Sequence, residues 1–79
     1  MNTELRPEIR AVMQRVKKRR WTPAALRSAL RSLHPDCTLE EVNAALQWNH
    51  AKGFVDYTFD SELECECWTI TQRGLAAKV

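Results

Sequence analysis

The sequence predicts an α+β fold in which three helices precede a β-hairpin. The first observation is a helix-period apolar pattern, which recurs over residues 7–18, 23–34 and 38–53. The second is a pair of helix start signals, centred on Thr22 and Thr38, before the second and third of these segments. The third is a change to period two after Gly53, over residues 54–60 and 63–71, which is typical of paired strands.

Length and composition indicate one small domain, which we expect to span residues 1–79 with a core at about 7–75. Of the 79 residues, 44% are hydrophobic and 28% are charged, as in ordinary globular proteins. No stretch approaches the roughly 18 apolar residues of a membrane helix, and the first residues lack the apolar segment of a secretory signal. Three cysteines argue against a disulfide framework. We therefore expect a reduced, cytoplasmic protein with no membrane partner.

The net charge of +2 hides a strong asymmetry along the chain. Residues 1–33 hold nine Lys and Arg against two acids, a net charge of +7. Residues 34–79 hold three basic residues against eight acids, a net charge of −5. Such a distribution indicates either a polyanionic partner for the first half or self-association between opposite halves.

The first predicted helix, about residues 7–18, has an apolar stripe formed by Ile9, Val12, Met13 and Val16. It ends in the basic run 17–20, where cations interact favourably with the helix dipole. A solvated helix end and a phosphate-contacting patch are both open interpretations of this run.

The second predicted helix begins at a strong local signal. Thr22 is a suitable N-cap, and Pro23 suits the first helical position. Trp21 is placed to pack on Leu26 across the cap. The helix is expected to end at His34, because the following proline disfavours helical backbone before it. Its apolar stripe consists of Leu26, Ala29, Leu30 and Leu33.

The third predicted helix is the best delimited. Thr38 and Glu41 have the spacing of a capping box, in which each side chain takes the other's free backbone N–H. Gly53 supplies the left-handed residue at which helices commonly stop. The core face consists of Val42, Ala45, Leu46 and Asn49. The amide of Asn49 requires hydrogen-bond partners if it is buried there.

The predicted hairpin turns at residues 60–62. This turn predicts a register in which the facing pairs are Val55 with Cys67, Tyr57 with Cys65, and Phe59 with Leu63. The register gathers the apolar residues of the hairpin on one face, although it also sets Asp56 opposite Glu66, an unfavourable pair. Trp21 and Trp68 are expected in the core. After the hairpin we expect a strand end and a frayed last turn.

Core and turn positions of the second half carry a family resemblance. They are Thr38, Val42, Ala45, Leu46, Gly53, Phe54, Val55, Trp68, Thr69, Ile70, Thr71 and Gly74. With this pattern the chain resembles the winged helix-turn-helix domains of small bacterial and phage DNA-binding regulators. The resemblance covers roughly residues 7–75, and because it rests on core and turn positions it concerns fold more than function.

The resemblance implies that the third helix enters the major groove of double-stranded DNA and that the hairpin is the wing. By position, Asn43 and Gln47 would read bases, each with an amide suited to adenine. Phosphate contacts are expected from Lys18, Arg19, Arg20, Arg27 and Arg31. The leading hypothesis is therefore a non-enzymatic DNA-binding protein, either a small transcriptional regulator or an accessory protein of a phage or mobile element.

Two departures from the family pattern support an alternative. The outward face of the third helix carries no arginine, and the wing carries five acids that would repel phosphates. Asn49 also stands where such helices usually have a core leucine. The alternative is a protein-interaction module or a homodimer, in which the acidic wing and a face formed by Ala44, Trp48 and Ala51 meet a partner. Trp48 itself is either tucked against the first helix or the wing, or exposed as an anchor.

Metal binding and catalysis find little support. Cys65 and Cys67, with Cys37 and His34 or His50, do not match the usual zinc-ligand spacing. No nucleophile motif, paired carboxylates in an apolar setting or Gly-rich phosphate loop is present in the sequence. We expect three free thiols, no metal and no cofactor.

Overall fold

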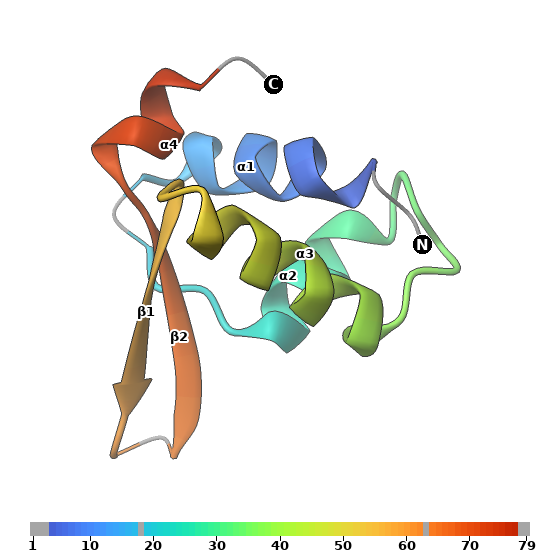
Figure 1. Cartoon of the computed structure of the whole chain (residues 1–79). Helices are drawn as coiled ribbons and strands as arrows, with labels where there is room; N and C mark the ends of the chain where they lie inside the picture. The colour runs from blue at the N-terminus through green and yellow to red at the C-terminus, as the bar shows by residue number, and fades with distance from the viewer. Residues whose placement is uncertain (1–3, 18, 63, 78–79) are drawn as a thin grey trace.

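The computed structural model describes residues 4–17, 19–62 and 64–77 of the chain. Three helices, a two-stranded antiparallel hairpin and a short last helix follow one another (Figure 1). The elements are α1 (Leu5–Arg15), α2 (Pro23–Leu30), α3 (Leu39–Ala51), β1 (Val55–Asp60), β2 (Cys65–Ile70) and α4 (Gln72–Ala76). The predicted order of three helices and a hairpin is confirmed, with α4 in place of the frayed turn. None of the helices in the described ranges is long and apolar enough to cross a membrane.

The core lies where α1, α2 and α3 meet the base of the hairpin. Its largest fully buried side chains are Trp68, Leu5, Ile9, Met13, Leu26, Leu30, Leu46, Val42 and Val55. The core begins at Leu5, before the expected start near residue 7, because α1 begins there. The helix also ends earlier than expected, at Arg15, so Val16 is 47% exposed and does not extend the apolar stripe.

The start of α2 follows the prediction, and its end does not. Thr22 caps the helix by accepting a hydrogen bond from the backbone N–H of Ala25 at 3.2 Å, and a proline occupies the first turn. The helix ends at Leu30, where the N–H groups of Leu33 and His34 both donate to the Leu30 carbonyl and turn the chain. Leu33 is therefore 62% exposed, so its expected place in the core was wrong. The same holds for the exposed Ala29.

The capping box of α3 is confirmed. The Glu41 N–H donates to Thr38 Oγ1 at 3.1 Å, and the Thr38 N–H donates to Glu41 Oε1 at 3.0 Å. Gly53 has φ +79°, the left-handed conformation that glycine adopts most easily and that ends the helix here. The predicted core face of α3 is fully confirmed, because each of its four members is buried.

The predicted register of the hairpin was wrong by three residues. Val55 pairs with Ile70, and Asp60 pairs with Cys65, which leaves residues 61–64 as the loop. Cys65 and Cys67 consequently lie on the face opposite Tyr57, and the unfavourable pairing of two acids does not form. Leu63, part of the predicted register, lies outside the described residues.

Trp68 explains this register. It exchanges two backbone hydrogen bonds with Trp21, at 2.7 and 2.8 Å, and it pairs with Tyr57 across the hairpin. The rings of Tyr57 and Trp68 meet edge-on, with centroids 5.2 Å apart. Trp21 and Trp68 are 5% and 1% exposed, as predicted. Burial of the Trp68 indole under the helices thus stabilises the observed register more than the predicted register would be stabilised by collecting smaller apolar residues on one face of the hairpin.

The short helix α4 is held against α1 and the end of α3. Thr71 caps it, accepting from the Gly74 N–H at 3.0 Å, and donates to the Gly53 carbonyl at 2.7 Å. Gln14 of α1 donates to the carbonyls of Gly74 and Ala77. A Cβ at Gly74 would collide with the carbonyl of Phe54, so glycine permits this close approach. The last helix is thereby fixed beside α1 and the start of β1 (Figure 1).

Candidate nucleic-acid interface

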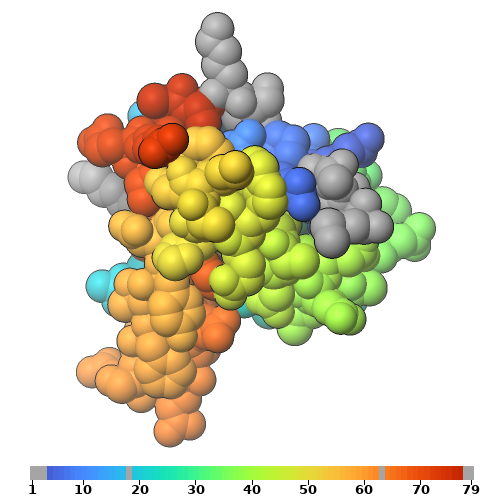
Figure 2. Space-filling view, viewed as in Figure 1, coloured from blue at the N-terminus to red at the C-terminus, as the bar shows by residue number. Residues whose placement is uncertain are grey.

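The outward side of α3 and the hairpin form one continuous face of the molecule. Figure 2 shows α3, the hairpin and α4 on this face, with part of α1 at its edge and α2 almost entirely behind α3. Along α3, Gln47 is exposed and Asn43 is half-buried, while Glu40, Ala44 and Ala51 are exposed. Of the two amides predicted to read bases, Gln47 is therefore open to solvent, whereas Asn43 is partly covered.

Trp48 lies at the edge of this face, against α1. It is half-buried, and its ring lies tilted against that of Phe54, with an interplanar angle of 43° and centroids 6.3 Å apart. The guanidinium carbon of Arg6 lies 4.8 Å from the Trp48 ring centroid, and Lys52 Nζ lies 5.5 Å from it. Both distances are within the range in which a cation is attracted to an aromatic face. Trp48 thus acts as a platform for cations from α1 and from the end of α3.

Arg10 and Asn49 form a buried polar pair between α1 and α3. Arg10 is 8% exposed and Asn49 is fully buried. Arg10 donates through Nη1 to Asn49 Oδ1 at 2.9 Å, and Asn49 donates to the carbonyls of Ala45 and Arg6 at 2.8 and 3.1 Å. The predicted need of Asn49 for partners is met. Burial lowers the pKa of Arg10, whose Nε has no partner among the described residues.

The ring of Phe54 also has two positively charged side chains close to it, those of Arg10 and Arg73. The guanidinium carbon of Arg10 lies 4.8 Å from the Phe54 ring centroid, and that of Arg73 lies 5.9 Å from it. The side chain of Arg73 also lies over Gly53, at the end of α3. We call this group the cation–aromatic cluster; its members are Arg6, Arg10, Trp48, Lys52, Phe54 and Arg73.

Sequence reasoning missed the cation–aromatic cluster, because its members come from α1, the end of α3, the start of β1 and α4. The local signal was the spacing of Arg6 and Arg10, which places both on one side of a helix. The charge count had assigned the basic character to the chain's first half as a whole. It did not indicate that Lys52 and Arg73, from the acidic half, lie close to the basic side chains of α1.

The residues predicted to contact phosphates are distributed over two other parts of the molecule. Arg19 stacks on the ring of Trp21 at 4.1 Å, and Arg20 forms an ion pair at 3.9 Å with Asp60 at the end of β1. Arg27 of α2 is half-buried and Arg31 is exposed. Lys18 lies outside the described residues. The structure places Arg19 and Arg20 beside the hairpin and does not bring them into contact with the outward face of α3.

The hairpin combines acids with exposed aromatic rings. Tyr57 and Phe59 are 44% and 55% exposed, and they lie between Asp56 and Asp60 on β1. At its base, His50 of α3 meets Trp68 edge-on, with centroids 5.8 Å apart. The acids that remain exposed are Asp56, Glu62, Glu64 and Glu66. This surface would repel DNA phosphates except where Arg20 offsets the charge of Asp60.

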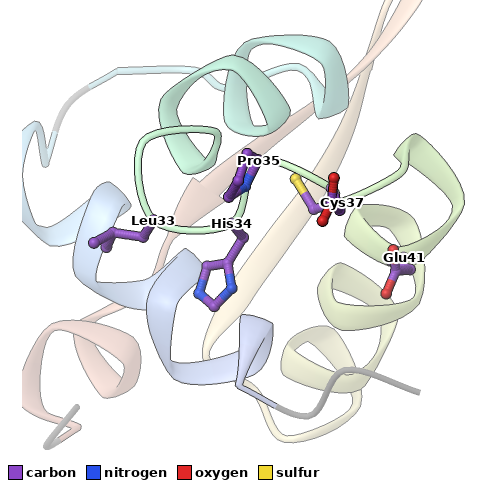
Figure 3. Close-up of a pocket in the computed structure, with 6 residues that line it drawn as sticks. Leu33, His34, Pro35, Cys37 and Glu41 are labelled. Carbon is purple, nitrogen blue, oxygen red and sulfur yellow. The ribbon is translucent and has the colours of Figure 1, made fainter.

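A cavity of about 260 Å³ lies between the turn after α2 and the first turn of α3 (Figure 3). It is lined by Leu33, His34, Pro35, Asp36, Cys37 and Glu41. Its histidine and cysteine are joined through the backbone, where the Cys37 N–H donates to the His34 carbonyl at 3.1 Å. Within the described ranges, no three His, Cys, Asp or Glu side chains are placed so that they could jointly hold a metal ion.

The three cysteines are free thiols. Cys37 and Cys67 are buried and Cys65 is half-buried. The sulfur atoms of Cys65 and Cys67 lie 4.0 Å apart on the same face of β2. Burial raises the pKa of the Cys65 thiol, and the neighbouring Cys67 and Asp60 raise it further. A raised pKa disfavours the thiolate form that reacts and binds metals.

Comparison with known proteins supports the fold and leaves the family open. No known protein family and no curated protein sequence matches the chain. Among solved structures, the chain is similar to the ferric uptake regulator Fur of Helicobacter pylori, whose structure is described as revealing three functional metal-binding sites. The TM-score is 0.76 at 15% identity, and the match covers 100% of this chain and 49% of the Fur chain. The chain thus spans about half the length of the Fur chain, and it has the α+β winged-helix fold.

Proposed function

We propose that this protein binds double-stranded DNA in the cytoplasm without catalysing a reaction, as a small transcriptional regulator or an accessory protein of a phage or mobile element. The observation that carries this proposal is the uncovered outward face of α3, which adjoins the hairpin on one side of the molecule (Figure 2). The likeness to Fur, described as a regulator, supports it at the level of the fold. Function itself depends on the residues of the site.

In this proposal α3 enters the major groove, and two of its amide side chains, the exposed Gln47 and the half-buried Asn43, read bases. Asn43 and Gln47 lie one helical turn apart, and an Asn or Gln side chain can bond both N6 and N7 of adenine. Arg19, Arg20, Arg27 and Arg31, with Lys18, supply phosphate contacts. These side chains carry no sequence information, so their loss should weaken binding to every duplex alike.

A titration of labelled duplexes, followed by fluorescence anisotropy over a salt series, tests the proposal. Each phosphate contact contributes about 0.9 to the slope of log K against log salt. Arg27→Ala with Arg31→Ala should therefore reduce the slope on all duplexes together. Gln47→Ala should mainly remove the preference between duplexes, with little change in slope. If wild-type protein at low salt binds no duplex, the DNA-binding proposal is wrong.

The acidic hairpin gives a matched control for the electrostatic argument. Glu64→Gln with Glu66→Gln removes two exposed negative charges from the wing. Binding to duplex DNA should then strengthen, most clearly at low salt, because screening is weakest there. Unchanged affinity would mean that the hairpin lies away from the DNA and that α3 docks without its wing.

A second candidate function is protein binding, and the exposed rings of the wing favour it. Tyr57 and Phe59 are large aromatic side chains on an acidic hairpin, a combination that suits a basic protein partner or a second copy of this chain. The face of Ala44, Trp48 and Ala51 would take part. Sedimentation equilibrium tests the homodimer directly: a concentration-dependent mass that returns to that of the monomer in Trp48→Ala would support it, and a constant monomer mass would exclude it.

A further inference from the structure

We propose that the cation–aromatic cluster is a phosphate-binding site that holds a backbone phosphate of the DNA beside the C-terminal end of α3. This inference rests on the proposed function and deepens it. It assigns phosphate contact to Arg6, Arg10, Lys52 and Arg73, a set that the sequence did not indicate.

The first observation is the buried charge of Arg10. Only 8% of the residue is exposed. Its hydrogen bonds go to a neutral amide and to the Arg6 carbonyl, and Nε has no partner among the described residues. None of the described carboxylates forms an ion pair with it. A buried cation without a counter-ion is costly, and a bound anion would offset that cost.

The second observation is the concentration of further cations around the same two rings. Arg6 and Lys52 lie over Trp48, and Arg73 lies over Phe54. Lys52 and Arg73 are exposed, and no carboxylate in the described ranges pairs with either. The dipole at the end of α3 attracts cations and explains the presence of Lys52 and Arg73 there. It does not explain why the buried Arg10 has no counter-ion among the described residues.

The chemistry of the cluster favours phosphate. Guanidinium groups present paired N–H donors that match two phosphate oxygens, and charge-assisted bonds of this kind are the strong ones. Three of the four cations are arginines. Each of the four cations lies over the ring of Trp48 or Phe54, which restrains its side chain, so less rotamer freedom is lost when a ligand binds.

The location of the cluster fits a DNA backbone. Lys52 is the C-cap residue of α3, so the cluster begins where the base-reading helix ends. Figure 2 shows that α3 meets α1 and α4 on the same side of the molecule as the hairpin. A duplex whose major groove receives α3 would therefore pass over this end of the helix. The cluster would supply cations that the outward face of α3 lacks.

The test uses Lys52→Gln and Arg73→Gln, because both side chains are exposed and each change removes one charge without disturbing the core. Arg15→Gln is the matched control: it removes one exposed charge from the end of α1, outside the cluster. Each cluster variant should reduce the salt slope by about 0.9, so between 50 and 200 mM salt its affinity should fall by a factor about threefold to fourfold smaller than that of the wild type. Arg15→Gln should leave the slope unchanged.

Nuclear magnetic resonance of the Arg10 Nε–H group supplies an independent readout. Duplex DNA should shift this signal in wild-type protein, and inorganic phosphate alone should produce a weaker, saturable shift that Lys52→Gln and Arg73→Gln reduce. If duplexes bind while both variants keep the wild-type slope, the inference is wrong and the proposed function stands. If no duplex binds but phosphate shifts the signal, the proposed function fails and the cluster is an anion site for another phosphate ligand. If neither ligand shifts the signal, the phosphate site itself is refuted.

Discussion

Replacement of Asn49 by leucine, alone and together with Arg10→Met, tests how the buried pair between α1 and α3 stabilises the fold. In the wild type, the guanidinium of Arg10 donates to Asn49 Oδ1 at 2.9 Å in a buried setting. Leucine has a similar size and no acceptor, so Asn49→Leu leaves a buried charge with its remaining bond, a 3.4 Å contact to the Arg6 carbonyl. Arg10→Met leaves the opposite defect, an amide oxygen without its donor.

The magnitudes follow from these two defects. A hydrogen bond to a charged group contributes about 1.5–3 kcal/mol, and an unsatisfied buried partner costs about 1–3 kcal/mol. We therefore expect each single variant to lower the free energy of unfolding by about 2 kcal/mol. The double variant removes both polar groups and replaces them with apolar side chains, so it should be close to the wild type. The contact of Arg10 with Phe54 is lost in Arg10→Met and in the double variant alike, so it cancels in the cycle.

Urea unfolding, followed by tryptophan fluorescence and far-ultraviolet circular dichroism, measures the four free energies of the cycle. The expected coupling between the two positions is about 4 kcal/mol, because each single variant loses about 2 kcal/mol and the double variant loses almost nothing. If the losses of the two single variants simply add within about 0.5 kcal/mol, the pair makes no coupled contribution and the reasoning is refuted. Arg15→Met controls for the loss of a positive charge from α1, because Arg15 is exposed.

Three further predictions concern the fold and the thiols. Leu46→Ala should lower the free energy of unfolding by about 2–5 kcal/mol because Leu46 is fully buried, whereas Leu39→Ala in the same helix, at a side chain 41% exposed, should cost far less; similar losses in urea unfolding would contradict the packing of α3. Thr38→Ala should cost about 0.5–2 kcal/mol by removing the capping box, visible as reduced helicity and a lower midpoint. Native mass spectrometry of protein expressed with added zinc should show three free thiols and no metal; a stoichiometric adduct that disappears in Cys67→Ser would overturn this.

The sequence by itself determined the features that depend on neighbours along the chain. The Thr22 cap, the capping box at Thr38 and the left-handed Gly53 were all predicted at the residues where they occur. Each of them is a contact or a backbone conformation within about three residues, so the local sequence contains all the chemistry involved. The periodicity of α3 likewise placed its buried face, including the polar Asn49.

Tertiary structure alone decided the features that join distant segments. The hairpin register depends on Trp68 meeting Trp21, a partner 47 residues earlier that alternation along the strand cannot reveal. Helix α2 ends at Leu30 because the chain turns there to bring α3 across the core. The apolar periodicity of the sequence does not contain this turn, and it therefore predicted a helix that was too long. In the cation–aromatic cluster, likewise, Arg10 and Arg73 become neighbours of Phe54 only because α1 and α4 pack together beside the end of α3. Charge and aromatic attraction depend on distance in space, and that distance is set by the packing of the whole chain.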